Sequence, residues 1–144
     1  MISTNSFNIY NASAGTGKTF SLVRDYLSLL LNSNNYELYK NILAITFTNK
    51  AVNEMKGRIV KYLINYSNSV DPDLIMLKEI SKKTGLSKKE IFLKSSTILK
   101  NLLKNYSAFE ISTIDKLTQK IVRNFTYELG IDSKYEVEID QNEI

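Results

Sequence analysis

The sequence contains no cysteine and no histidine. These absences exclude disulfide bonds, zinc sites built from cysteine or histidine, and catalysis by either side chain within the chain. The lack of cysteine also fits a reducing, intracellular setting. Residues 1–10, MISTNSFNIY, lack the basic start and apolar run of a signal peptide. The longest apolar run, LSLLL at 27–31, is far too short to cross a bilayer, so we expect a cytoplasmic protein without membrane contact.

Charge is spread unevenly along a chain of domain size. The 144 residues are 43% hydrophobic, enough for a buried core, and carry a net charge of +4. Residues 50–104 hold 12 basic and 5 acidic residues, whereas residues 131–144 hold 5 acidic residues and one lysine. A basic middle suits a polyanionic partner, although charge alone favours the alternative, a solvated helical surface.

Apolar periodicity predicts strands and helices in alternation. Strands are expected at 7–12, 41–48 and 108–112, and helices at 18–32 and 51–63. The strand at 41–48 has a nearly continuous apolar half, which is typical of a strand buried on both faces. Strands and helices that alternate in this order predict an α/β fold, with a parallel sheet flanked by helices.

A pair of helices is expected between the second and third strands, within residues 67–106. Asp71 and Pro72 form a helix-start signal, and Gly85 a stop signal. Ser87 and Glu90 have the spacing of a capping box, and Leu86 and Ile91 that of a hydrophobic staple, so a second helix should follow to about residue 105.

Capping-box spacing recurs at Ser112 and Asp115, ahead of an apolar-periodic helix that Gly130 should stop. Beyond it, Tyr135, Val137 and Ile139 alternate with polar residues, as in a half-exposed strand.

Residues 11–20, NASAGTGKTF, approach the phosphate-loop pattern G-x-x-x-x-G-K-[ST], with alanine in place of the first glycine. Glycine lets the backbone curl around a phosphate, and the helix N-terminus adds partial positive charge. Lys18 would reach the β- and γ-phosphates as the catalytic lysine, and Thr19 would ligate Mg²⁺. The alternative is an ordinary glycine-rich turn with an exposed lysine. The expected nucleotide-binding residues are Ala12, Ser13, Ala14, Gly15, Thr16, Gly17, Lys18, Thr19 and Phe20.

Three stretches resemble motifs of the UvrD/RecB-like DNA helicases of superfamily 1, and most closely the RecB/AddA branch. They are residues 11–31, residues 42–59 (ILAITFTNKAVNEMKGRI) and residues 111–125 (ISTIDKLTQKIVRNF). The resemblance implies that residues 1–144 form part of a RecA-like P-loop NTPase domain, the N-terminal part of subdomain 1A. Residues 67–106 would then be an insertion, and residues 131–144 the start of the next subdomain. It also implies ATP and Mg²⁺ as cofactors and single-stranded or duplex DNA as partner.

Two segments are candidate DNA contacts. The first follows the second strand, at the edge where open α/β sheets bind ligands. There Phe47 could stack on a base, although it could instead lie in the core while Thr48 or Asn49 caps the helix. In the second segment Asp115 stands where the family commonly has histidine, and capping explains the polar residues equally well. The candidates are Thr46, Phe47, Thr48, Asn49, Lys50, Ser112 and Thr113.

The resemblance also implies parts that the sequence does not contain: an acidic D-E-x-Q-D segment, a γ-phosphate-sensing glutamine and arginine fingers. We therefore expect the ATP-binding part of an ATP-dependent DNA helicase, or of a helicase-nuclease of recombination repair, that does not hydrolyse ATP alone. The alternative is a small stand-alone nucleotide-binding module without translocation. In related sheets the acidic strand lies between strands that this chain retains, so we expect exposed strand edges and self-association.

Overall fold

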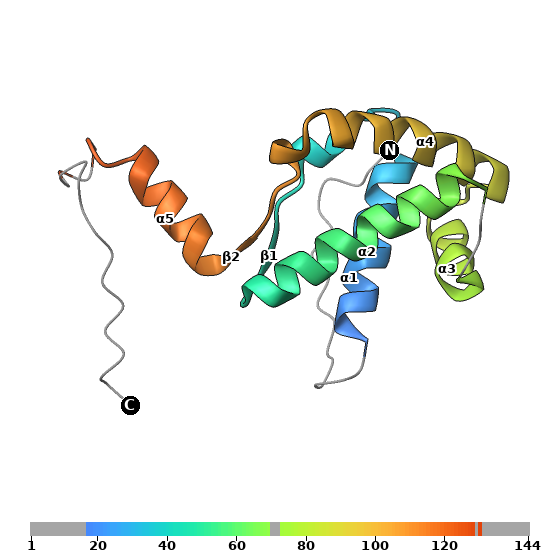
Figure 1. The fold of residues 1–144 in the computed structure, drawn as a ribbon, viewed down its shortest axis with the longest axis horizontal. Helices are drawn as coiled ribbons and strands as arrows, with labels where there is room; N and C mark the ends of the chain where they lie inside the picture. The colour runs from blue at the N-terminus through green and yellow to red at the C-terminus, as the bar shows by residue number, and fades with distance from the viewer. Residues whose placement is uncertain (1–16, 70–72, 129, 131–144) are drawn as a thin grey trace.

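The computed structural model describes residues 17–69, 73–128 and 130. In this part of the chain helices predominate over two short strands (Figure 1). The first half contains α1 (Lys18–Asn32), the 3₁₀ helix η1 (Leu38–Asn41), β1 (Ala44–Thr46) and α2 (Asn49–Ser67). The second half contains α3 (Leu74–Thr84), α4 (Lys88–Lys104), η2 (Tyr106–Ala108), β2 (Ile111–Thr113) and α5 (Ile114–Asn124).

The two strands pair in parallel, with Ala44 opposite Ile111 and Thr46 opposite Thr113. The expected α/β class is thus confirmed in part, as a small two-stranded parallel sheet with helices packed against it. Both strands are shorter than expected: η1 and η2 end at the first residue of each expected strand, and pairing begins only at Ala44 and Ile111. The pairing is direct, so a missing strand cannot lie between β1 and β2.

The expectation that the second strand is buried on both faces is wrong for β1. Its central residue, Ile45, is 46% exposed. The helix α2 packs against both strands and covers their other side, whereas Ile45 has no comparable cover among the described residues.

The core lies between the helices rather than around the sheet. The packing of α2 on α4 is the most extensive, and α1 packs mainly on α3. Tyr26 of α1 meets Phe109 edge to face, with ring centroids 5.7 Å apart, and the Tyr39 hydroxyl donates to the Asn101 carbonyl at 2.9 Å. The fully buried large side chains are Tyr39, Tyr66, Phe109, Leu27, Leu30, Leu31, Ile59, Leu63, Met76, Ile80, Ile91 and Ile98.

The helical pair forms as expected, with one change at its start. The N-cap of α3 is Asp73, whose side chain accepts from the backbone N–H groups of Ile75 and Met76. The cap expected at Asp71 and Pro72 is therefore wrong; those two residues lie outside the described part of the chain. Gly85 ends α3 with a left-handed φ of +75°.

The capping box expected at the start of α4 is confirmed. Both bonds between Ser87 and Glu90 are present. Leu86, expected to pair with Ile91 as a staple, packs on the buried cluster that contains Ile91.

The last helix differs from expectation at both ends. Its N-cap is Thr113, which accepts from the Lys116 N–H at 3.3 Å, so the expected box at Ser112 and Asp115 is wrong. It ends at Asn124, before Gly130, and stands away from the other helices (Figure 1). The strands expected at 7–12 and near 135–139 lie outside the described residues.

Candidate nucleotide and nucleic-acid site

The first helix begins where the sequence predicts the end of a phosphate loop. Gly17 is the N-cap of α1 and has φ +81°, a left-handed conformation that favours glycine. A Cβ at this position would meet no atom of the described residues within 4 Å, and the left-handed backbone conformation by itself favours glycine here. Of the predicted nucleotide-binding residues, Ala12 to Thr16 lie outside the described part of the chain.

The start of α1 suits an anion. No described side chain caps it, and its first turn carries no acidic residue, so the partial positive charge of the helix terminus is not neutralised there. Lys18 is exposed, Thr19 is half-buried, and Phe20 packs partly buried against the core. These residues fit a nucleotide: Lys18 and the N–H groups of the first turn would hold phosphate, and the Thr19 hydroxyl would hold Mg²⁺.

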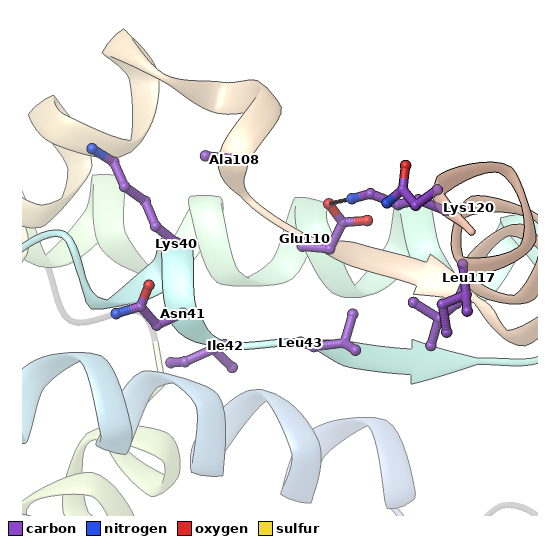
Figure 2. Close-up of a pocket in the computed structure, with 10 residues that line it drawn as sticks. Lys40, Asn41, Ile42, Leu43, Ala108, Glu110, Leu117 and Lys120 are labelled. Atoms are coloured by element: carbon purple, nitrogen blue, oxygen red, sulfur yellow. Dashed lines mark hydrogen bonds and ion pairs between the residues drawn. The ribbon is translucent and has the colours of Figure 1, made fainter. Parts of the chain in front are cut away.

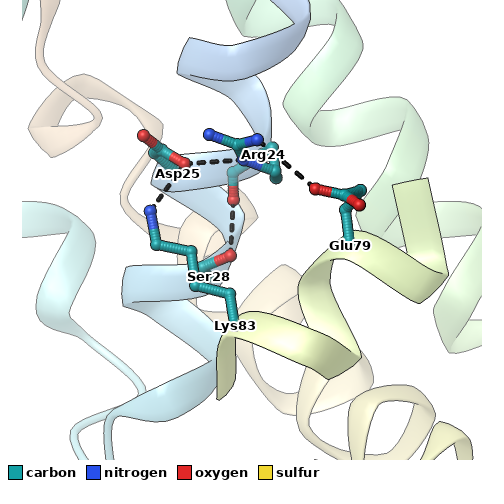
Figure 3. Close-up of polar contacts among 5 residues, drawn as sticks. All are labelled: Arg24, Asp25, Ser28, Glu79 and Lys83. Atoms are coloured by element: carbon teal, nitrogen blue, oxygen red, sulfur yellow. Dashed lines mark hydrogen bonds and ion pairs between the residues drawn. The ribbon is translucent and has the colours of Figure 1, made fainter. Parts of the chain in front are cut away.

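Helix α1 is held by polar contacts with α3 (Figure 3). The Arg24 guanidinium pairs with Asp25 at 2.8 Å and reaches Glu79 of α3 at 3.4 Å. From α3, the Lys83 ammonium pairs with Asp25 at 2.7 Å. These side chains are partly exposed, so the pairs fix how the helices lie more than they add to stability.

The far end of α1 is held by α4. The Lys94 ammonium donates to the backbone carbonyl of Leu31 at 2.8 Å and to that of Ser33 at 3.2 Å. The last turn of α1 has no basic residue of its own, so Lys94 supplies the positive charge that a helix C-terminus favours. The sequence pattern gave no sign of this contact, because its partners are more than sixty residues apart.

The loop after β1 leaves its aromatic residue in solvent. The Phe47 side chain is 85% exposed, so it does not lie in the core. Thr48 is the N-cap of α2, where its hydroxyl accepts from the Ala51 N–H at 3.1 Å, as the capping alternative expected. Asn49 and Lys50 are exposed, and Thr46 is half-buried.

The second candidate DNA segment lies at the same edge of the sheet. The strand register sets Thr46 opposite Thr113, so the structure brings together two segments that are far apart in the sequence. However, Ser112 is 9% exposed and Thr113 is 4% exposed, and the Thr113 hydroxyl caps α5. Asp115 is exposed in the first turn of α5, where a carboxylate stabilises the helix terminus.

Most lysines of the basic middle are exposed on α2, α3 and α4. Lys56 differs, because its ammonium lies over the rings of Tyr106 and Phe109, 5.5 Å from each centroid. Across the described residues, no three acidic side chains converge as they would around a metal ion. No helix in the same residues is long and apolar enough to span a membrane.

Comparison with known proteins matches residues 2–143 to the family model described as UvrD/REP helicase N-terminal domain. The chain is 32% identical over 155 aligned residues to the RecBCD enzyme subunit RecB of Buchnera aphidicola, covering 99% of this chain and 12% of that protein. It is 31% identical over 143 residues to an ATP-dependent helicase/nuclease subunit of Streptococcus uberis, covering 99% of this chain and 10% of that protein.

A third relative, the RecBCD enzyme subunit RecB of Borreliella burgdorferi, is 36% identical over 131 residues, covering 89% of this chain and 10% of that protein. The chain thus spans about a tenth of the length of these curated relatives. No solved structure matches it.

Proposed function

Because the chain belongs to the UvrD/REP helicase N-terminal domain family, we propose that it is the nucleotide-binding part of an ATP-dependent DNA helicase that acts in DNA unwinding and recombination repair. Its relatives, named as RecB and as an ATP-dependent helicase/nuclease subunit, support this proposal. In this proposal residues 1–144 belong to a RecA-like subdomain, residues 67–106 are an insertion into it, and residues 131–144 begin the next subdomain. We expect such an enzyme in the cytoplasm.

The observation that carries the DNA-binding part of the proposal is the exposure of Phe47. Phe47 is 85% exposed between two polar residues, so its apolar ring stays in water and does not contribute burial energy to the fold of the described residues. A base stacked on its ring would recover about 1–3 kcal/mol. Thr46, Thr48 and Asn49 can bind phosphate or sugar, and Lys50 adds charge.

Ser112 and Thr113 hold a second position in this site. They lie beside Thr46 at the same strand ends but are largely buried. Our proposal therefore assigns direct DNA contact to residues 46–50. Ser112 and Thr113, largely buried beside the end of β1, would touch DNA only at the edge of this loop.

The nucleotide part of the proposal rests on the start of α1. Gly17, Lys18 and Thr19 are the described members of the predicted loop, and their conformation and exposure suit a bound phosphate. Bound Mg²⁺–ATP would supply the transferable phosphoryl group. Lys18 would hold the β- and γ-phosphates and Thr19 would orient the metal. Because the sequence has no acidic D-E-x-Q-D segment to position water, the 144-residue chain alone should bind ATP without efficient hydrolysis.

The DNA-binding test replaces Phe47 by alanine. Loss of a stacked base should weaken binding to a fluorescent single-stranded oligonucleotide by roughly fivefold to 150-fold, measured by anisotropy at fixed salt. The control is Tyr127→Ala, since Tyr127 is 93% exposed but lies outside the loop. Equal affinities for the Phe47→Ala chain and the unchanged chain would count against stacking.

The nucleotide test replaces Lys18 by alanine. Calorimetry with ATP and Mg²⁺ should show binding by the unchanged chain and by Lys100→Ala, a control in which the lysine lies on α4, but none by Lys18→Ala. Unchanged ATP affinity in Lys18→Ala would remove the phosphate loop from the proposal. Nucleotide binding without any DNA binding would favour the alternative, a nucleotide-binding module that does not translocate.

A further inference from the structure

The outer face of α2 is a line of three exposed residues, Lys50, Gly57 and Lys61. They recur at intervals of seven and four residues, so they lie along one side of the helix. From the first lysine to the second, the helix rises through three turns, or about 16 Å. This face begins at the loop of residues 46–50, which carries the proposed DNA contacts.

The two lysines of the outer face have no anionic partner in the described part of the chain, where neither Lys50 nor Lys61 forms an ion pair. The lysine at the cleft between α5 and residues 40–43 is different (Figure 2). There the Lys120 ammonium pairs with the Glu110 carboxylate at 2.9 Å. The outer face of α2 therefore offers an anion two positive charges that no carboxylate offsets.

The acidic residue nearest to this face is already paired. Glu54 accepts from the Arg58 guanidinium at 2.8 Å, four residues further along α2. Residues 50–61 hold four basic residues and this one acidic residue. Charge complementarity therefore favours a polyanion as the partner of this face.

Gly57 lies between the two lysines, where the described fold does not call for glycine. It is in the interior of a 19-residue helix and has no left-handed φ. A Cβ there would meet no atom of the described residues within 4 Å. Glycine in a helix interior is destabilising relative to alanine, but it lets the backbone of a partner approach closely. Gly57 therefore fits a surface along which a partner chain lies.

We propose that a bound DNA strand continues from the loop of residues 46–50 along the outer face of α2. Lys50 and Lys61 each pair with a phosphate, and Gly57 leaves room for the sugar–phosphate backbone between them. At 3.4 Å per nucleotide, about five nucleotides cover the distance between the two lysines. This inference rests on the proposed function and extends its DNA contacts three turns beyond the loop.

The first test measures how the binding of a fluorescent oligothymidylate to the 144-residue chain depends on salt. Lys61→Gln should weaken binding by about twofold to fivefold at fixed salt. It should also reduce the slope of log affinity against log salt by about 0.7, the value for one phosphate of a single strand. The control, Lys100→Gln, removes one exposed charge from α4 and should leave the slope unchanged. Equal slopes for the two variants would overturn the proposal.

The second test places a side chain between the two lysines. Gly57→Ala and Gly57→Leu should both raise the thermal stability of the chain, since alanine and leucine favour a helix interior. They should nevertheless weaken oligothymidylate binding, by at least about threefold for leucine, because its side chain moves a phosphate away from its lysine. A merely structural role for Gly57 predicts no loss of affinity in a more stable chain. A Gly57→Leu chain that binds as tightly as the unchanged chain would overturn the proposal.

This inference and the proposed function fail in different ways. If Phe47→Ala weakens binding while Lys61→Gln and Gly57→Leu keep full affinity, DNA contacts the loop alone and only this inference is overturned. If the unchanged chain binds no oligothymidylate, the proposed DNA binding is overturned together with it. Sedimentation tests another occupant, since a dimer that Gly57→Leu dissociates would place a second copy on this face and overturn the assignment to DNA.

Discussion

Asp73 offers the sharpest test of how the helical pair is built, because its carboxylate serves two elements at once. It accepts from the backbone N–H groups of Ile75 and Met76 at 3.1 Å each, and from the Tyr62 hydroxyl of α2 at 2.6 Å. Loss of an N-cap costs about 1 kcal/mol. Loss of a hydrogen bond to a partly exposed carboxylate costs about 1 kcal/mol more. Asp73→Ala should therefore lower the free energy of unfolding by about 2 kcal/mol, measured by urea denaturation followed by circular dichroism.

The charge of Asp73 can be separated from its cap with Asp73→Asn, since asparagine caps helices as well as aspartate does. The Tyr62 hydrogen bond and the two backbone bonds hold the pKa of Asp73 below its ordinary value. A lowered pKa in the folded state stabilises the fold above the ordinary aspartate pKa of about 3.9, and this stabilisation is lost as the pH falls through the folded value. The unchanged chain should thus exceed Asp73→Asn in stability at pH 7 and lose that advantage at lower pH.

Tyr62 of α2, which donates a hydrogen bond to Asp73, allows a second test of the same contact. Burial and the bond to Asp73 raise the pKa of Tyr62 to about 12. The hydroxyl is therefore neutral across the ordinary range, and its stabilising effect should fade only as the pH rises from about 10 toward 12. Tyr62→Phe combined with Asp73→Ala should show a coupling energy near 1 kcal/mol. Additive effects of the two changes, or parallel acid profiles for the unchanged chain and Asp73→Asn, would refute the assignment of this hydrogen bond.

Two further predictions concern other helix ends. Lys94→Met keeps the apolar stem but removes the ammonium from the last carbonyls of α1, so it should cost about 1.5 kcal/mol in urea denaturation. The control, Lys100→Met on α4, should change the free energy of unfolding by no more than about 0.5 kcal/mol. An equal loss of stability in both variants would show that Lys94 does not stabilise the end of α1. Gly85→Ala should lose about 1–2 kcal/mol in thermal denaturation, because its φ of +75° is strained for alanine. Gly57→Ala within α2 should instead gain about 0.5–1 kcal/mol of stability, because alanine favours a helix interior. A gain of stability in both variants would contradict the role of Gly85 as the left-handed end of α3.

Local signals predicted the helices better than the strands. The capping box at Ser87 and Glu90 and the stop at Gly85 depend on residues that are neighbours in sequence, and both are confirmed. The length and burial of β1 depend on which elements cover the sheet, and a stretch such as residues 41–48 carries no information about that cover. The sequence also does not show which of two adjacent polar residues caps a helix. Ser112 was expected to cap α5, but Thr113 does so.

The candidate site shows the same division. Phe47 could have been core or surface from its sequence position, and only the fold of β1 into α2 leaves it 85% exposed. The family resemblance, in contrast, rests on short stretches of consecutive residues, and the comparisons confirm it across residues 2–143. Glu79 and Lys94 were not expected beside α1, because their contacts join residues far apart in the chain.

These long-range contacts join the helical pair to α1, the helix whose start is the candidate nucleotide site. Helix α1 begins at the residues expected to hold phosphate, and the pair contacts it twice, through Glu79 and Lys83 of α3 and through Lys94 of α4. A phosphate site at a helix N-terminus depends on the direction of that helix, since its N–H groups point along the axis. The pair therefore fixes the axis of α1 from outside the sheet. Weakening of nucleotide binding by Lys94→Met, with the loop sequence unchanged, would be the sign that this support reaches the site.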